Sequence, residues 1–254
     1  MADASRGGKE ELPHIDVTER AGHHTGNPQA LETRLFMQLM VFDCAAESMP
    51  DAEADALAAA LDERGVPAVL YADAQHPRGL GLLTWSEDPA HFVQGVRTAV
   101  VERGAALVQR AGWSMLGRTY ATGYEPDLRW WLLERAVENV CNEQHAWAVW
   151  YPLRRSGAFA RLPDAERGEV LKEHGLIGRA YGAQDLAHDI RLACHGLDAR
   201  DNEFVIGLVG KELHPLSHIV ERMRRTRQTS EFIAQMGPFF IGRVLRRVAA
   251  RRAS

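Results

Sequence analysis

The predicted elements recur in the same order in the two halves of the chain. Each half reads strand, helix, strand, strand, helix, strand, from hydrophobic periodicity and from helix start and stop signals. Predicted strands lie at 35–42, 68–74, 79–87, 113–123, 147–154, 189–196, 202–210 and 238–245, and predicted helices at 51–65, 92–106, 163–182 and 217–233. This β-α-β-β-α-β order is that of a ferredoxin-like unit. We therefore predict an α+β chain with two such units.

Two stretches support a duplication directly. Residues 81–96 and 204–220 share a strand, an acidic turn, a proline, a histidine and an apolar helix start. Two antiparallel sheets with helices on one face can pack together and enclose space for a flat ligand. The predicted organisation is a disordered tail (1–32), an N-terminal domain (33–124), a connector (125–146), a C-terminal domain (147–246) and a second tail (247–254).

Composition and motifs exclude several classes of function. The 254 residues carry 30 basic and 34 acidic side chains, a balance that does not indicate nucleic-acid binding. No apolar run reaches the ~20 residues of a membrane span, and the N-terminus lacks a secretory core. The widely spaced Cys44, Cys141 and Cys194 suggest neither a disulfide framework nor a thiolate zinc site. With no P-loop, dinucleotide, zinc-protease or nucleophile-elbow motif, we expect a cytoplasmic protein of another class.

His174 is the first candidate for chemistry. It lies on the predicted helix 163–182, with Val170 four residues before it and Ile177 three residues after it. Its side chain therefore shares an apolar helix face. Such a histidine is either a satisfied core residue or an axial ligand, because a neutral imidazole in an apolar pocket suits haem iron.

The stretch WAVWYPLRR (147–155) is the second candidate. Strand alternation places Tyr151 and Leu153 on one face and Arg154 on the other. Tyr151 is either a core residue with a satisfied hydroxyl or a donor of an electron and a proton. Arginines nearby can bind carboxylates. The basic stretch 221–230 is either a solvated helix end or an anion clamp.

Taken together, these stretches resemble the chlorite dismutase superfamily, and most closely its coproheme decarboxylases. The resemblance covers most of residues 35–245 and is carried by five blocks in the family's order, at 150–155, 162–182, 195–208, 223–232 and 237–243. It implies two ferredoxin-like domains forming a dimeric α+β barrel, haem b or coproheme in the C-terminal domain, and a homo-oligomer, by resemblance a pentamer.

The resemblance also implies roles for individual residues. His174 corresponds to the proximal iron ligand, and Tyr151 to the tyrosine that becomes a radical. Arg155 or Arg154 stands where the decarboxylases carry a lysine. The remaining cofactor-binding candidates are Leu153, Arg224 and Thr229, with Arg179 and Arg135 as weaker ones.

The distal side of the implied haem leaves alternatives open. The position of the dismutase arginine corresponds to Asp189, to Ala187 if two residues are inserted, or to Arg191 if the strand shifts by two. Asp189 would then be a general base toward peroxide. The glutamate that dismutases place behind the proximal histidine corresponds to Val209, which argues against dismutase chemistry.

The predicted function is therefore peroxide-dependent decarboxylation of coproheme propionates to haem b vinyl groups through a tyrosyl radical. Its partners would be an iron porphyrin and hydrogen peroxide. The alternatives are another haem-dependent oxidoreductase of the same family, such as a peroxidase or chlorite dismutase, and a non-enzymatic haem carrier or sensor.

Overall fold

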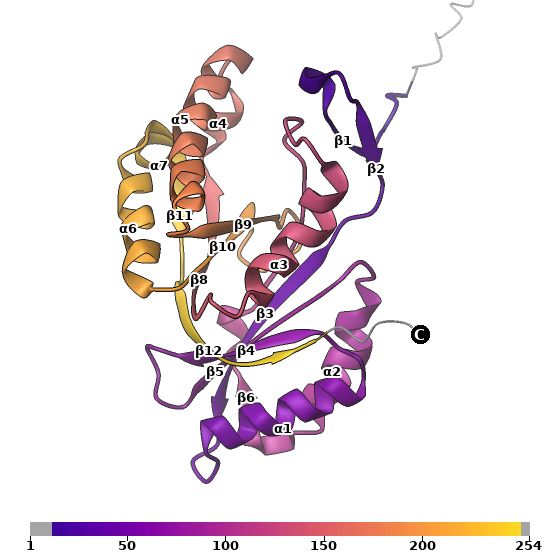
Figure 1. Cartoon of the computed structure of the whole chain (residues 1–254), viewed down its shortest axis with the longest axis vertical. Helices are drawn as coiled ribbons and strands as arrows, with labels where there is room; N and C mark the ends of the chain where they lie inside the picture. Colours follow the sequence, from indigo (N-terminus) through magenta and orange to yellow (C-terminus); the bar gives the residue numbers. More distant parts are fainter. Residues whose placement is uncertain (1–11, 250–254) are drawn as a thin grey trace, which may run out of the picture.

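A closed antiparallel barrel dominates the computed structural model, which describes residues 12–249 (Figure 1). The strands hydrogen-bond in the order β7-β3-β5-β4-β12-β8-β10-β9, and β9 returns to β7. Their bounds are β3 (Phe36–Cys44), β4 (Ala68–Asp73), β5 (Gly79–Ser86), β7 (Met115–Arg118), β8 (Trp147–Arg155), β9 (His188–Ala193), β10 (Phe204–Gly210) and β12 (Phe240–Val248). The short strands β6 (Leu107–Gln109) and β11 (Ile233–Met236) pair with β3 and β8.

The two halves of the barrel have the same internal order. In each half, the first strand lies between the third and the fourth, and the second lies outside the third. Two seams join the halves, β4 with β12 and β7 with β9. The predicted α+β class and the repeated order of strands are thereby confirmed.

Helices cover the outside of the barrel in each half (Figure 1). The first half carries α1 (Pro50–Glu63) and α2 (Arg97–Val101), which follows a π-helical turn at Phe92–Val96. The second carries α4 (Gly157–Ala160), α5 (Asp164–Ala183), α6 (Leu213–Arg224) and α7 (Arg227–Phe232). Within residues 12–249, no helix is both long and apolar enough to cross a bilayer.

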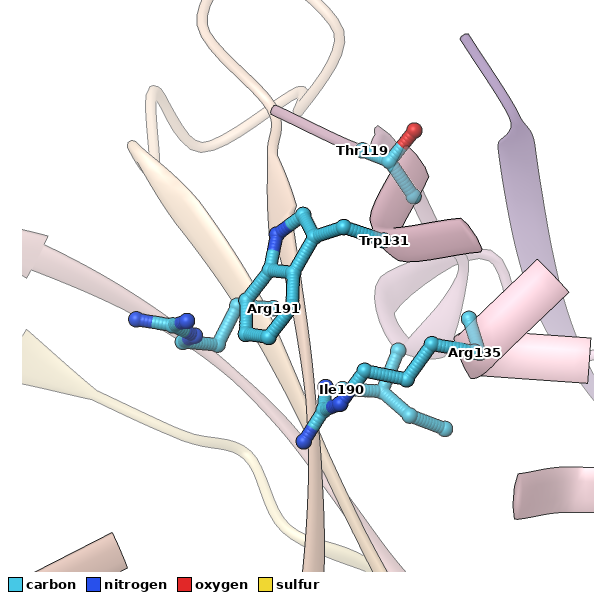
Figure 2. A pocket seen from close by; sticks show the side chains of 6 residues that line it. Thr119, Trp131, Arg135, Ile190 and Arg191 are labelled. Atoms are coloured by element: carbon cyan, nitrogen blue, oxygen red, sulfur yellow. The ribbon is translucent and has the colours of Figure 1, made fainter. Parts of the chain in front are cut away.

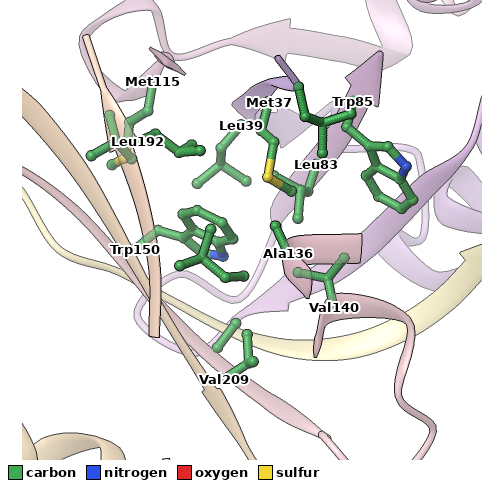
Figure 3. Close-up of a cluster of buried hydrophobic side chains, with 14 of the residues drawn as sticks. Met37, Leu39, Leu83, Trp85, Met115, Ala136, Val140, Trp150, Leu192 and Val209 are labelled. Atoms are coloured by element: carbon green, nitrogen blue, oxygen red, sulfur yellow. The ribbon is translucent and has the colours of Figure 1, made fainter. Parts of the chain in front are cut away.

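Alternation along β8 separates two hydrophobic clusters. Ala148 and Trp150 face the barrel interior, whereas Val149, Tyr151 and Leu153 belong to the cluster under α5 and α6. Trp150 is fully buried at the centre of the barrel (Figure 3). The other side of β8 therefore presents Tyr151 toward the helices.

The segment 125–146, expected to be a connector, contains a helix. A π-helical turn (Trp130–Glu134) leads into α3 (Arg135–Cys141). Apolar residues at helical spacing, Leu132, Ala136 and Val140, pack into the barrel core. Burial of this apolar face against the barrel core stabilises the helix.

Part of the expected N-terminal tail is also ordered. Strands β1 (Glu19–Ala21) and β2 (Gln29–Leu31) form a hairpin. The Glu19 carboxylate pairs with Arg34 and Arg118, and the Gln29 amide donates to the carbonyl of Pro126. These contacts to distant segments stabilise a hairpin that local sequence does not predict. Residues 1–11 of the expected tail lie outside the described residues, as do 250–254 of the C-terminal one.

The predicted helix 217–233 is interrupted. It ends at Arg224 and restarts at Arg227, because Thr226 takes an extended conformation and its side chain accepts the Thr229 N–H. The basic stretch therefore spans a helix end, a turn and a helix start.

A substitution in the barrel core tests its packing. A Cβ on Gly207 would lie 2.6 Å from the indole of Trp150, so Gly207→Ala should destabilise the fold by ~1–3 kcal/mol. The matched control is Gly168→Ala on the exposed side of α5, where a Cβ meets nothing and helix propensity should add up to ~1 kcal/mol. Urea unfolding midpoints measure both; equal effects would contradict this packing.

Candidate functional site

His174 lies on the buried side of α5. It shares that side with the buried Val170 and Tyr181, and its Nδ1 is 3.4 Å from Thr226 Oγ1. The Thr226 hydroxyl hydrogen goes to the carbonyl of Met223 at 2.7 Å, so the oxygen accepts from His174 Nδ1–H. The neutral ring then keeps its proton on Nδ1, and Nε2 retains a free lone pair.

Burial keeps the His174 ring neutral. Loss of solvent is the main reason that the pKa of His174 falls to about 4, and the charge of Arg191 lowers it further. Asp189 acts on His174 in the opposite direction. At neutral pH the side chain is an unprotonated nitrogen donor, the state that binds a metal.

Tyr151 lies on the sheet face that α5 and α6 cover. Across three strands, Tyr151, Ile206 and Arg191 are direct neighbours, so their side chains share that face. Tyr151 is 6% exposed and stacks on Phe239 with ring centroids 4.5 Å apart. Burial raises the pKa of Tyr151, and the charge of Asp189 raises it further. The phenol therefore stays protonated at neutral pH.

Asp189 is held between two arginines. Its Oδ1 accepts from Arg135 Nη2 at 2.7 Å, and its Oδ2 lies 3.0 Å from Arg191 Nε. Burial would raise the pKa of this carboxyl, but Arg135 and Arg191 outweigh burial and hold the pKa below its usual range. Asp189 is an ionised carboxylate with both oxygens occupied.

Trp131 supports both arginines. The guanidinium of Arg135 lies 4.5 Å from its ring centroid and that of Arg191 lies 5.1 Å away. These side chains line a small pocket between α3 and β9 (Figure 2). Arg135 also donates to the backbone carbonyl of Asp189 at 2.7 Å, which ties α3 to β9.

The structure brings some of the predicted residues to Tyr151 and not others. Leu153 is buried in the same cluster, and the charge of Arg224 acts on the pKa of Tyr151. Arg155 shares the strand face but is paired with Glu203 at 3.0 Å and lies 4.6 Å from the Phe204 ring centroid.

The other predicted residues are less directly placed. Arg154 lies on the opposite face of β8, where it pairs with Asp201. Arg179 is exposed on α5, on the solvent side of the helix. Thr229 is held at the start of α7, where its N–H donates to the side chain of Thr226.

The residue behind His174 is not the one expected. Val209, the position matched to the dismutase glutamate, packs into the barrel interior on the other face of β10. The partner of His174 is instead Thr226, which the sequence prediction placed inside a continuous helix. A threonine at a helix start was the signal that could have revealed it. Asp189 and Arg191 both lie on the α5 side of β9, while Ala187, just before β9, is buried in the Tyr151 cluster.

Comparisons with solved structures place the fold among known proteins. A haem-binding protein from Thermus thermophilus superposes with a TM-score of 0.65 and 18% identity, covering 91% of this chain and 95% of that one. A double-mutant chlorite dismutase from Candidatus Nitrospira defluvii gives a TM-score of 0.64 and 14% identity, covering 84% and 92%. At these identities the likeness shows the fold.

A relative by sequence comes from Haloarcula marismortui and is named as a candidate haem-binding protein. It is 28% identical over 167 residues, which are 60% of this chain and 23% of the relative. This chain thus spans less than a quarter of that protein.

The family comparison covers the larger part of the chain. The family model described as chlorite dismutase matches residues 72–245, from β4 into β12. The match includes the strand of Tyr151, the helix of His174 and the strand of Asp189. The chain therefore belongs to the chlorite dismutase family.

Proposed function

We propose that this chain binds an iron porphyrin through Nε2 of His174 and decarboxylates its propionates at the expense of hydrogen peroxide. The substrate would be coproheme and the product haem b. The names of the Haloarcula and Thermus relatives support an iron porphyrin as the ligand.

The residues present fit such a ligand. His174 is a neutral nitrogen donor whose tautomer Thr226 sets, an arrangement that histidine ligands of metals commonly show. Two arginines, Arg135 and Arg191, surround the single carboxylate of Asp189, so this part of the site carries an excess positive charge. Such an excess suits an anionic ligand group.

The buried, protonated phenol of Tyr151 is the observation that best supports decarboxylation. A buried phenol that keeps its proton can give up an electron and that proton together. It shares the strand face of Arg191, and the charge of Arg224 reaches it. These cations can hold a propionate beside the phenol.

The proposed reaction balances for each propionate. When bound, the iron porphyrin supplies the two-electron reduction of hydrogen peroxide to water. Tyr151 gives up an electron and a proton. The resulting tyrosyl radical then takes a hydrogen atom from the propionate carbon that is attached to the porphyrin ring. Loss of carbon dioxide and a second electron leaves a vinyl group. One propionate, one peroxide and one proton yield one vinyl group, one carbon dioxide and two waters.

Asp189 suits a positioning role better than the general-base role expected from the sequence. An efficient base has a pKa near the working pH, but two arginines hold the pKa of Asp189 low. We therefore assign it the task of fixing the guanidinium of Arg191 on the Tyr151 side of β9.

Arg191 also favours a second candidate function. A guanidinium on the same face as Tyr151 can stabilise an anionic oxidant such as chlorite, or bound peroxide. Haem-dependent dismutase or peroxidase activity is therefore the alternative, and product analysis separates it from decarboxylation.

Turnover of ferric coproheme tests the proposal. With stepwise addition of hydrogen peroxide, mass spectrometry should show the loss of two carboxyl groups. Tyr151→Phe should lower the conversion at least ~100-fold, because phenylalanine cannot cycle a proton and an electron, while porphyrin binding is retained.

The matched control is Tyr181→Phe, another tyrosine of the same hydrophobic cluster, whose hydroxyl bonds His218. This variant should turn over like the wild type. A wild-type protein that binds coproheme and only bleaches it, or that decomposes chlorite efficiently to chloride and dioxygen, would transfer the assignment to the second candidate.

The neutral state of His174 can be tested without porphyrin. The unfolded chain protonates this ring near pH 6.5, whereas the folded protein does so only near pH 4. As the pH falls through this window, the unfolded state gains a proton that the folded state refuses, so stability declines. The His174→Gln variant has no imidazole to protonate at this position, so its stability should not decline for this reason. Urea unfolding should show the wild type losing up to about 1.4 kcal/mol per pH unit relative to the variant; parallel profiles would show an exposed, ordinary histidine.

A further inference from the structure

We propose a second site, in which His145, Asp185 and His188 bind a divalent zinc-class cation. One nitrogen or oxygen atom from each of these side chains lies within 4.8 Å of the others. His145 follows α3, Asp185 is in the turn after α5, and His188 begins β9. Segments distant in sequence therefore meet at one rim of the barrel.

His145 is already arranged as a metal ligand. It is 3% exposed, and its Nδ1 lies 2.8 Å from the carbonyl oxygen of Asn139. A carbonyl only accepts, so Nδ1 carries the proton and Nε2 of the neutral ring carries the lone pair. Zinc-bound histidines are typically fixed by such a bond to a backbone carbonyl.

The other two side chains present their donor atoms toward this nitrogen. His188 Nε2 lies 2.8 Å from Asp185 Oδ1, and the same oxygen lies 3.9 Å from His145 Nε2. The two imidazole rings stack with centroids 4.7 Å apart. A cation between the three atoms would replace the hydrogen now shared by His188 and Asp185.

The donor set defines the class of ion. Two imidazole nitrogens and one carboxylate oxygen suit zinc and related borderline cations, whereas calcium and magnesium prefer oxygen ligands alone. Water would complete the four ligands of zinc. The bound ion would fasten the α5–β9 turn to the end of α3.

This site is separate from the porphyrin proposal. Alternation along β9 places His188 and Asp189 on opposite faces, so the metal site lies away from Tyr151 and His174. Its success or failure is therefore independent of the proposed enzyme activity.

Lys211 provides a directional test. Its Nζ lies 2.5 Å from Asp185 Oδ2, so an ammonium occupies the other oxygen of the carboxylate. When zinc binds, the Lys211 ammonium must either leave Asp185 or stay close to a second positive charge, and both outcomes weaken zinc binding. Lys211→Gln should therefore bind zinc several-fold more tightly, an effect opposite to that of losing a ligand.

Calorimetric titration of the EDTA-treated and dialysed 254-residue protein with zinc chloride tests the site. The wild type should take up one zinc equivalent that raises its melting temperature. His188→Ala and Asp185→Asn should each lower the affinity for this zinc ion at least tenfold. Both side chains are partly exposed, at 22% and 51%, so these variants should fold.

Other histidines provide the controls. His24 near the N-terminus and His218, which stacks with His214 on α6, are alternative places for adventitious zinc. His24→Ala and His218→Ala should keep the equivalent. The proposal is overturned if the wild type shows no saturable zinc binding, or if binding survives in His188→Ala and Asp185→Asn but is lost in a control.

Discussion

The unequal closure of the barrel is the constraint on which the rest of the structure depends. On one side, β12 pairs with β4 continuously from Gly242 to Val248, apart from one irregularity. On the other, β9 and β7 share a single residue pair, Arg118 with Ala193. The backbone of β9 therefore lacks a strand partner along most of one edge. Helix α3 covers part of this edge, where Arg135 donates to the carbonyl of Asp189 and Ala136 packs into the core.

Strand β9 presents a pair of charged residues on one face and a histidine on the other. Asp189 and Arg191 project toward α5, where their opposite charges compensate one another in a buried setting. A lone carboxylate there would be costly, and the two arginines make its burial tolerable. His188 projects the other way, toward His145. Strand β9 is paired with β10 along one edge, and side chains help to fix the other edge, where strand pairing is sparse.

Local sequence patterns predict the parts of this arrangement that depend on periodicity. The strand predicted at 147–154 and the helix predicted at 163–182 both form, and alternation correctly places Tyr151 and Leu153 on the same face. The helix at 130–141 was missed although its apolar spacing is regular, because Pro126 and two adjacent tryptophans resemble a connector. The N-terminal hairpin has strands too short to show alternation, and its stability comes from distant partners of Glu19 and Gln29.

The sequence likewise predicted only those parts of the candidate site that depend on local periodicity. His174 and Tyr151 are visible as residues on apolar faces, but the Thr226 hydroxyl behind His174 and the Arg135 clamp on Asp189 come from segments far along the chain. Hydrogen bonds of this kind depend on tertiary packing, which no local pattern encodes. The resemblance implied roles for His174 and Tyr151, while the Thr226 hydroxyl behind the histidine had to come from the structure.

The long seam also bears on the order in which the protein can mature during its synthesis. Strand β4 is made early, but its partner β12 follows every other strand of the barrel along the chain. Until β12 is made, the first half presents β4 as an open edge, the kind of surface that recruits strands from other chains. Such distant pairings are slow to form because the intervening loop must close first. The nascent first half therefore depends on the second half, or on a chaperone, to protect this edge from aggregation.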